Sequence, residues 1–535
     1  MKKTKFAKIV ALMVMAVMIL TSCGGGGGPV AVDDSGGGRT HVYFAQYQTP
    51  LMDWDPHIAS DLEPAVFFNV YETLLRFDPE TDTFIYVLAE SYDISEDGYV
   101  WTFHLRRGVT FHNGEPFNAD AVKFTVDRIL RMGMSSAYLW APVDEVVVVD
   151  DHTVEFHLND PAPVNLIVSS NMTAWIICPS VGDDDEAATA WFSEGNMNGT
   201  GPYMLQSFVP GSEVVLTMNP NYWGGWPEGR QNIETIMIRA VSEAASRRQL
   251  MESGEADMTV NLTSEDNVAL MDNPNVEVVV TDSYQNMTMF INTQKPPLNN
   301  VLVRQAISHT YPAYMYVDYV QLGHFASIPT DTLMHRAIWG ARQGPGEPYP
   351  FDLDRAAELL AEAGYPDGGF TLRVTVMTGV EDRRRIAELW QSELAKVGIT
   401  LEIDIKLFEA MHAEAREADK TKIQDFMTIG NWPDIVHPSS MLYNCAHSDG
   451  AWSFSYFNSP ELDSMLDHAY YVSAVDLVEG KRLFEELNQW VADQAIFINM
   501  GDRKSVKVIS DRLQGYKPNP AYEKIPFFYD MWLSE

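Results

Sequence analysis

The sequence has few cysteines and, beyond its first residues, no long hydrophobic run. Only three cysteines occur among 535 residues, which excludes a dense disulfide framework. After residue 22, no apolar stretch reaches the ~20 residues that a membrane-spanning helix needs. Hydrophobic residues make up 46% of the chain and charged residues 21%, which is a globular composition. The length exceeds what one compact core usually holds, so the sequence predicts two or more lobes.

Basic residues are also scarce. There are 37 lysines and arginines against 74 aspartates and glutamates, giving a net charge of −37. Nucleic-acid binding needs a basic face that neutralises phosphates, so we expect no nucleic-acid partner. Two interpretations of the acidity stay open. It favours a cationic or zwitterionic ligand, or it belongs to a soluble envelope surface that repels its neighbours.

The motifs of common enzymes are missing. The chain contains no G-x-S-x-G, no G-x-x-x-x-G-K and no H-E-x-x-H. Gly199-Thr200-Gly201 begins like a dinucleotide loop, but Pro202 follows at once. His437, His447 and Asp434 form the one cluster worth testing as a metal site, and their spacing is not that of a known closed site. We therefore predict no enzyme, no catalytic residue, no cofactor and no metal.

The first residues are typical of a secretory signal. Lysines at positions 2, 3, 5 and 8 precede an apolar stretch from Ile9 to Leu20, which is too short to span a membrane. Leu20-Thr21-Ser22 leads directly into Cys23 and five glycines, which resembles the bacterial lipobox. This resemblance implies that residues 1–22 are removed and that Cys23 is lipidated. The alternative is a simple signal peptide with an incidental cysteine. The glycine-rich residues 23–39 would form a flexible tether. Because of the signal and the lipidated cysteine, we expect the rest of the chain outside the cytoplasm, anchored to the bacterial membrane.

Later segments alternate between strand and helix patterns. Residues 146–149 and 154–158 flank Asp150-Asp151 and predict a β-hairpin. Residues 372–376 and 401–405 alternate as strands around a helical pattern at 386–397, which indicates a parallel strand–helix–strand unit. Asp352 is placed to cap a helix that Gly364 ends. The sequence therefore predicts an α/β fold in more than one lobe.

A set of short motifs then follows in a fixed order along the chain. They are Asp78-Pro79, Ala89-Glu90-Ser91-Tyr92, the stretch from Trp101 to Val122, Gly199-Thr200-Gly201-Pro202-Tyr203, Asn219-Pro220-Asn221-Tyr222-Trp223, Asn292-Thr293, Val303-Arg304-Gln305-Ala306-Ile307, Asn458-Ser459-Pro460-Glu461-Leu462-Asp463 and Gly515-Tyr516. This series resembles the extracytoplasmic solute-binding proteins of family 5, which serve dipeptide, oligopeptide and nickel ABC importers. The resemblance covers essentially the whole mature chain.

The resemblance implies a two-lobed periplasmic-binding-protein-like fold, with an inserted subdomain in the first lobe and closure over a ligand. Lobe I would hold residues 40–70, 195–290 and 497–535, the inserted subdomain residues 71–194, and lobe II residues 291–496. The hinge crossings would lie near Phe290-Ile291-Asn292 and near Phe497.

The resemblance also implies where a ligand binds. Asp434 falls on the aspartate that meets a peptide's α-amino group in relatives, a charge-assisted contact. Ile435 and His437 depart from the pattern there, which weakens the assignment to a peptide, and Asp434 as a loop brace stays open. Trp432 is a candidate for stacking on the ligand. The remaining predicted contacts are His437, then Tyr47 and Trp54 after the first strand, and Tyr138 and Trp140 in the subdomain. For Cys178 and Cys445, a disulfide and two buried free thiols both stay open.

We therefore expect a lipid-anchored binding protein that captures a small peptide or similar solute and passes it to the permease subunits of an ABC importer. The main alternative is a nickel or metal-chelate ligand. An envelope hydrolase and a structural or adhesive lipoprotein are the alternatives from other classes, and no nucleophile–base pattern supports the hydrolase.

Overall fold

The computed structural model describes residues 40–47, 54–58, 64–78, 81, 83–134, 137–170, 172–342, 346–378, 380–522 and 525–534. It consists of two units, residues 1–40 and residues 41–535. Cys23, the predicted signal and the predicted tether lie outside the described residues. No helix in the described part of the chain is both long enough and apolar enough to cross a membrane.

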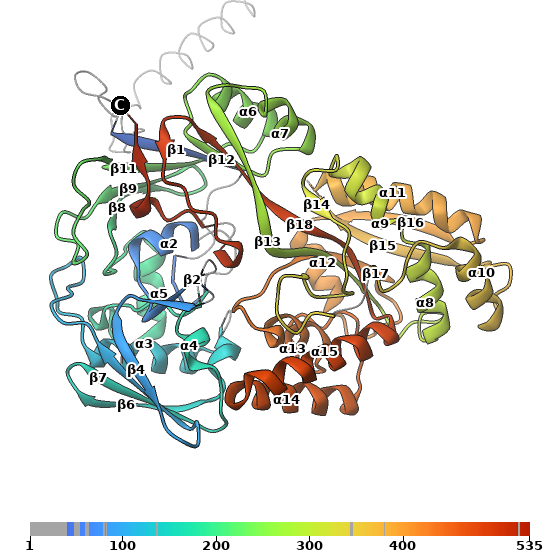
Figure 1. The fold of residues 1–535 in the computed structure, drawn as a ribbon, viewed down its shortest axis with the longest axis horizontal. Coiled ribbons are helices and arrows are strands. Elements are labelled where there is room, and N and C mark those ends of the chain that lie inside the picture. Colours follow the sequence, from blue (N-terminus) through green and yellow to red (C-terminus); the bar gives the residue numbers. More distant parts are fainter. Residues whose placement is uncertain are drawn as a thin grey trace, which may run out of the picture. The chain divides into compact units, whose positions relative to one another are not determined.

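Within residues 41–535, eleven of the described strands form one sheet (Figure 1). The order is β16-β15-β17-β13-β18-β12-β1-β11-β9-β8, and β14 pairs with β18 beside this path. We call the end from β12 to β8 lobe I, and the end from β17 to β16 lobe II. The structure therefore joins both lobes through a shared sheet, as the α/β prediction requires.

Lobe I is built from segments at both ends of the chain. Its core packs the first strand against aromatic residues of α2 and of the closing segment, for example Phe44 against Phe528. Its elements are β1 (His41–Gln46), α2 (Pro64–Val70), β8 (Tyr203–Val209), β9 (Glu213–Met218), β10 (Gln231–Asn232), β11 (Thr235–Ala240), α6 (Ala244–Glu252), β12 (Met258–Val260), α7 (Ser264–Leu270), β19 (Leu513–Gln514), η4 (Pro520–Tyr522), η5 (Phe528–Asp530) and β20 (Trp532–Leu533).

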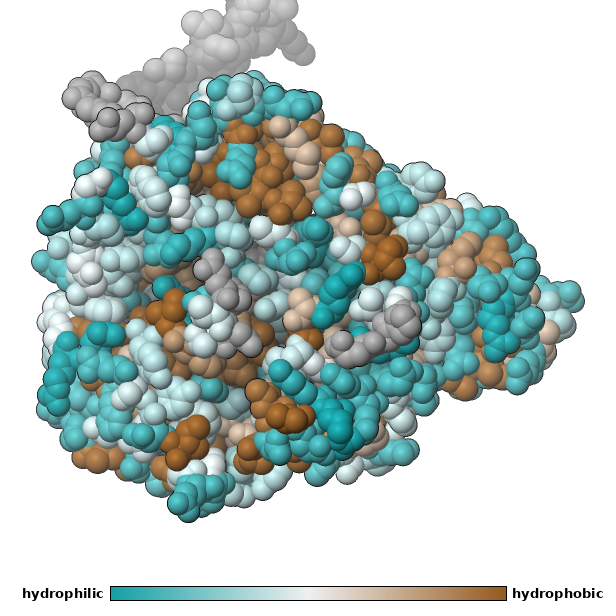
Figure 2. Space-filling model, in the orientation of Figure 1, coloured by the Kyte–Doolittle hydropathy of each residue, from teal (hydrophilic) through white to brown (hydrophobic). Residues whose placement is uncertain are grey.

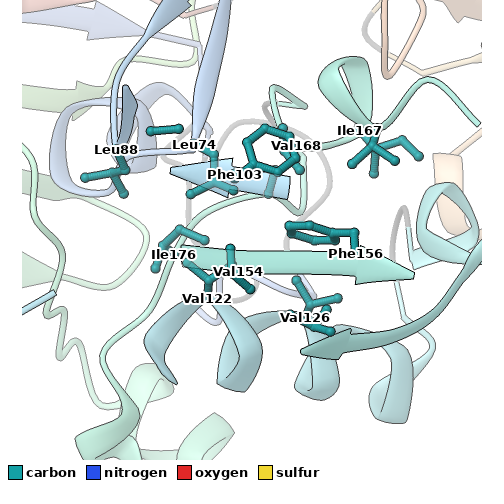
Figure 3. Packing of buried hydrophobic residues seen from close by; sticks show 14 of the residues in the cluster. Leu74, Leu88, Phe103, Val122, Val126, Val154, Phe156, Ile167, Val168 and Ile176 are labelled. Carbon is teal, nitrogen blue, oxygen red and sulfur yellow. The ribbon is translucent and has the colours of Figure 1, made fainter. Parts of the chain in front are cut away.

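The chain between α2 and β8 forms the subdomain, whose main sheet has the order β4-β5-β7-β6. The side chain of Asn118 caps α3, and Val122 and Val126 of that helix point toward Val154 and Phe156 of the sheet (Figure 3). Strands β6 and β7 pair antiparallel, which confirms the predicted hairpin. The elements are β2 (Leu75–Asp78), β3 (Thr83–Tyr86), β4 (Ala89–Ile94), β5 (Val100–Leu105), α3 (Ala119–Met132), η1 (Ala137–Trp140), β6 (Val143–Asp150), β7 (Thr153–Leu158), α4 (Val164–Ile167), η2 (Pro179–Val181) and α5 (Asp185–Ser193).

The Gly199-Thr200-Gly201 motif fixes the return from the subdomain to lobe I. A β-carbon at Gly199 would lie 1.9 Å from the carbonyl oxygen of Val70, and the backbone N–H of Gly201 donates to that oxygen at 2.9 Å. Only glycine allows two backbones to approach so closely. The motif is therefore a packing device, which agrees with giving it no role as a cofactor loop.

Lobe II contains the predicted strand–helix–strand unit. Strands β15 and β16 pair in parallel with α11 between them, and Asp352 caps α10 by accepting from a backbone N–H in its first turn. Both predictions are confirmed. The elements are α8 (Val301–Thr310), α9 (Ala313–Met315), η3 (Tyr316–Val320), β14 (Ala326–Ser327), α10 (Leu353–Glu362), β15 (Thr371–Met377), α11 (Glu381–Lys396), β16 (Thr400–Lys406), α12 (Phe408–Ala415), β17 (Phe426–Asn431), α13 (Pro438–Ala446), α14 (Pro460–Val475) and α15 (Leu477–Gln494).

Two long strands, β13 (Val276–Ile291) and β18 (Phe497–Ser510), run side by side between the lobes (Figure 1). Strand β18 meets β12 of lobe I at residues 507–509, and β13 meets β17 of lobe II at residues 286–291. The register of the pair is irregular between Asp282 and Asn286. Both strands continue through the junction, and the predicted crossings near Phe290 and Phe497 stay predictions. The predicted domain limits themselves stay predictions.

The visible face of the protein is largely hydrophilic (Figure 2). Figure 2 shows hydrophilic residues over most of the visible face, with hydrophobic residues gathered in separate patches. Both interpretations of the net charge of −37 therefore stay open.

Candidate functional site

The segment from Asn431 to Pro438 connects the end of β17 to the start of α13. His437 is the N-cap of α13 and accepts a hydrogen bond from the backbone N–H of Ser439. The backbone N–H of Asp434 donates to Ser440 Oγ at 2.7 Å. These bonds hold the segment at the carboxyl end of β17, and in open α/β sheets ligands bind beyond the carboxyl ends of the strands.

Asp434 meets the subdomain directly. The hydroxyl of Tyr138 donates to Asp434 Oδ2 at 2.5 Å, and Ser170 Oγ donates to the carbonyl oxygen of Asp434 at 3.2 Å. The amide of Asn444 donates to the same Tyr138 hydroxyl at 3.4 Å. Burial first, and then the charge of Asp434, raise the pKa of Tyr138 well above its usual value. The phenol therefore stays protonated and can remain the donor.

The two residues after Asp434 are packed into cores outside lobe II. Ile435 is 4% exposed and belongs to the subdomain core, whereas Val436 is 9% exposed and packs with the lobe I core. Apolar burial on this scale is a substantial stabilising contribution. The segment thus joins lobe II to both other parts of residues 41–535.

The other predicted contacts are distributed around this junction. Trp432 and Tyr47 are half-buried, and residues 48–53 of the loop after Tyr47 lie outside the described residues. Trp54 is 3% exposed and packs edge-to-face on Phe208, with ring centroids 4.8 Å apart. Trp140 is buried, and its indole N–H donates to Thr173 Oγ1 at 3.1 Å. Trp54 and Trp140 are therefore packed as core residues are. Ligand contact stays a prediction for both of them and for Tyr47 and Trp432.

His437 is buried between two serines. Its ring nitrogens lie 2.6 Å from Ser439 Oγ and 3.0 Å from Ser473 Oγ, and burial lowers its pKa to about 3. The imidazole is therefore neutral at physiological pH. Its contact with ligand stays a prediction.

The metal cluster considered from the sequence is not assembled. His437 and His447 cap opposite ends of α13, and a nine-residue helix at ~1.5 Å per residue separates them by roughly 14 Å. His447 lies instead 3.8 Å from Asp463 and 3.7 Å from Asp467. The described residues contain no group of three or more His, Cys, Asp or Glu side chains placed to hold a metal ion.

Cys178 and Cys445 are both buried and are free thiols, so the second of the two open interpretations holds. Cys445 lies in α13, with its sulfur 3.9 Å from Asn431 Oδ1. Burial and the nearby Asp434 raise its pKa, which keeps the thiol protonated and unreactive.

A second polar group lies at the start of α11 and was missed by the sequence analysis. Arg383 in the first turn of this helix is 8% exposed. The neighbouring Arg385 forms an ion pair with Glu265 of α7 at 2.6 Å, so this turn contacts lobe I. The signal in the sequence is the run Arg383-Arg384-Arg385 at a helix start, where the helix dipole disfavours cations.

A cavity of about 180 Å³ lies elsewhere in lobe II. Its lining includes Gln305, His309, Tyr349 and Gln489, and it contains none of the predicted ligand contacts. We therefore place the candidate site at the junction around Asp434 and at the start of α11.

The fold and this junction define a class: a two-lobed solute-binding protein whose lobes share a pair of long strands. The family of bacterial extracellular solute-binding proteins, family 5 Middle, matches residues 83–453, more than half of the chain. The chain belongs to this family. It is therefore an extracytoplasmic substrate-binding component of an ABC importer.

Similar proteins agree with this assignment. The glutathione-binding protein GsiB of Pectobacterium atrosepticum is 27% identical over 478 residues, covering 87% of this chain and 89% of the relative. The probable D,D-dipeptide-binding periplasmic protein DdpA of Escherichia coli is 28% identical over 445 residues, covering 82% and 83%. The structure of the periplasmic binding protein DppA from Helicobacter pylori in complex with peptide STSA has a TM-score of 0.79 at 25% identity, covering 92% of this chain and 98% of that one.

Proposed function

We propose that this protein captures a short peptide or similar small solute at the junction around Asp434 and delivers it to the permease subunits of an ABC importer. The observation that carries the proposal is an acidic side chain held where lobe II meets the subdomain. A half-buried carboxylate is a suitable partner for a ligand ammonium, because a charge-assisted hydrogen bond in a site that closes over it is strong. Relatives that bind glutathione and peptides support a solute with an amino group.

The Tyr138 hydroxyl donates to one oxygen of the Asp434 carboxylate, and an ionised carboxylate offers about four acceptor positions. The same bond makes Tyr138 part of the site, since it fixes the carboxylate toward the subdomain. We propose that the ammonium group binds the Asp434 carboxylate beside Tyr138.

The lobes would close about the central strand pair. The register of the β13–β18 pair shifts between Asp282 and Asn286 and again between Met287 and Thr288, where the two strands run from lobe I into lobe II. A bend confined to a few strand residues is a common form of hinge closure. We propose the hinge at this irregularity, with lobes and subdomain limited as predicted from the sequence.

The ligand is identified by releasing small molecules from the purified protein by denaturation and analysing them by mass spectrometry. We expect amine-bearing peptides or peptide-like solutes, depleted in preparations of Asp434→Asn. A metal chelate in the extract would favour the metal-chelate alternative. Turnover of peptides or esters by the purified protein would contradict the further proposal that it performs no covalent chemistry.

The membrane anchor is a separate proposal that concerns Cys23. We propose that Cys23 carries lipid and holds the protein at the bacterial membrane. Cys23→Ser is expected to give a folded protein that loses lipid labelling and leaves the membrane fraction. Unchanged labelling and membrane retention would contradict the anchor without affecting the solute-binding proposal.

A further inference from the structure

The segment between β17 and α13 is fixed to lobe II at its base. The backbone N–H of His437 donates to the carbonyl oxygen of Ile435 at 2.7 Å, and the backbone N–H of Asp434 donates to Ser440 Oγ. The ring of His437 packs edge-to-face on Trp339, with centroids 4.7 Å apart. Since these contacts are made within lobe II, the segment would move with that lobe as one piece.

Two buried side chains of this segment nevertheless belong to cores outside lobe II. Among the described residues, the other buried members of the core that contains Ile435 come from positions 74–178. The core that contains Val436 draws its other buried members, within the same part of the chain, from positions 42–258 and 509–533. Ile435 and Val436 thus project from lobe II into two different neighbours.

Helix α14 of lobe II adds apolar contacts to the subdomain (Figure 1). Tyr470 is partly buried against the same core as Ile435. A β-carbon at Gly98, in the turn between β4 and β5, would lie 3.5 Å from Val475 Cγ1 at the end of the helix. The surface between lobe II and the subdomain is therefore apolar at several points, and Ile435 is the most deeply buried of them.

Parting of the lobes would withdraw these side chains from their cores into water. Burial of one aliphatic side chain is favourable by an amount that corresponds to about a ten- to hundredfold change in an equilibrium constant. A solute held between closed lobes has an apparent affinity that falls in proportion to the equilibrium constant for closure. The two side chains would thus contribute a constant factor to the affinity for any solute, whatever groups it carries.

We propose that Ile435 and Val436 form a closure clasp, which enters the subdomain and lobe I when the lobes close over the solute. The inference rests on the proposed function, because it concerns closure over that same solute. Asp434 directly precedes the clasp, so insertion of Ile435 brings its carboxylate to the hydroxyl of Tyr138. The two clasp residues are positioning residues, since they act on the solute through closure and through Asp434.

The first test asks whether Ile435 is a permanent member of the subdomain core. Bound small molecules are removed in denaturant, and the refolded proteins are unfolded by heat. The matched control is Ile176→Ala, which truncates the same side chain within that core (Figure 3). We expect Ile176→Ala to lower the unfolding temperature by about 3 °C or more, because it leaves a cavity. Ile435→Ala should lower it by about 1 °C or less, because the side chain is in water when the lobes are apart.

The second test measures the contribution of the clasp to binding. The probe is a pool of random di-, tri- and tetrapeptides with free carboxyl termini, the free-acid peptide pool. The pool concentration that gives half-maximal thermal stabilisation is expected to rise at least about tenfold in Ile435→Ala. It should rise less in Ile435→Val, which keeps most of the apolar surface, and stay unchanged in the exposed control Ile94→Ala. Val436→Ala should also raise it, and the two factors should multiply in the double variant because the side chains enter separate cores.

The outcomes separate the clasp from the proposed function. Equal losses of unfolding temperature in Ile435→Ala and Ile176→Ala, or failure of Ile435→Ala to fold, would make Ile435 a permanent core residue and overturn the clasp. An unchanged response of folded Ile435→Ala to the pool would also overturn it and leave peptide capture intact. No stabilisation of wild type by the pool overturns the peptide proposal, and the unfolding comparison then decides the clasp by itself.

Discussion

Two buried arginines of this protein have opposite surroundings. Arg128 of α3 is fully buried and bonds both oxygens of Asp55, at 2.8 and 2.5 Å. Arg383 of α11 is almost as buried and donates to one backbone carbonyl. A buried charge is retained at low cost only when it is paired, so Arg128 is a structural element, whereas Arg383 carries the cost of a buried charge with no carboxylate bonded to it among the described residues. Burial alone does not distinguish the two roles, whereas the list of partners does.

The surroundings of Arg128 show what full pairing does. Asp55 comes from the short segment after β1, and it also accepts from Thr189 Oγ1 of α5 at 2.7 Å. His57 Nδ1 lies 2.9 Å from Arg128 Nη1, and burial lowers the pKa of His57 to about 4, so it accepts as a neutral ring. The network ties lobe I to the subdomain.

The largest expected effect is loss of this paired arginine. Arg128→Gln leaves the Asp55 carboxylate buried without its cation, so we expect the free energy of unfolding to fall by about 3–5 kcal/mol. Arg131→Gln on the same helix removes an exposed ion pair with Asp185 and should cost about 1 kcal/mol or less. Urea unfolding followed by circular dichroism measures both. Equal losses of unfolding free energy in the two variants would contradict the distinction between a buried and an exposed ion pair.

The sequence predicts local structure better than it predicts which buried arginine is paired with a carboxylate. The hairpin at residues 146–158, the strand–helix–strand unit at 371–406 and the cap at Asp352 depend on nearby residues, and all are confirmed. The pairing of Arg128 depends on Asp55, which is 73 positions away in the chain. No local pattern reports such a contact, so Arg128 and Arg383 look alike in the sequence.

The same limit applies to the candidate site. Asp434 was found through the resemblance of its segment, and its neighbour Tyr138, also predicted, lies 296 positions away. Tyr222 and Trp223, which the sequence analysis names only as a motif, both donate to the carboxylate of Glu72, at 2.8 and 2.7 Å. The polar atoms of aromatic residues find partners through the tertiary fold, which a sequence pattern does not show.

The second effect concerns Asp434, the acidic residue of the candidate site. Asp434→Asn and Asp434→Ala are each expected to weaken binding of the released ligand by about 2–5 kcal/mol, because the ligand ammonium would be left buried without a carboxylate. Titration calorimetry measures the loss, with the exposed Asp449→Asn as control. Unchanged affinity in folded variants would reduce Asp434 to a brace for its loop.

The third effect comes from a buried carboxylate that has no cation bonded to it in the part of the chain that the structure describes. Glu72 accepts from Thr200, Tyr222 and Trp223, and burial raises its pKa to about 7. The folded protein therefore holds the proton of the Glu72 carboxyl group more tightly than the unfolded chain does. The stability that this proton contributes to the fold is full below about pH 4.5 and is lost as the pH rises through about 7. The loss is about 2–4 kcal/mol.

Glu72→Gln removes the titrating carboxyl group. The free energy of unfolding of the variant should therefore lack the fall that Glu72 causes between about pH 4.5 and about pH 7. The test is the difference in unfolding free energy between wild type and Glu72→Gln at pH 4.5 and pH 7.5, with the exposed Glu234→Gln as control. A difference that does not change between these pH values would contradict the account of Glu72.

The smallest effect completes the comparison of the two arginines. Arg383→Gln is expected to leave the free energy of unfolding of the unliganded protein within about 1 kcal/mol of wild type, or to raise it, because an unpaired buried charge is removed. Urea unfolding alongside Arg128→Gln checks this. A loss as large as that of Arg128→Gln would mean that Arg383 is a structural residue after all.

Hydrogen exchange read by mass spectrometry tests the central claim most directly, because it locates the captured solute without altering the protein. The free-acid peptide pool is added at saturating concentration, and exchange is compared with the unliganded protein. The account predicts slower exchange at residues 381–385 and 428–436, with no change at residues 119–132 around Arg128. Protection confined to other segments, such as the cavity beside Tyr349 and Gln489, would contradict it.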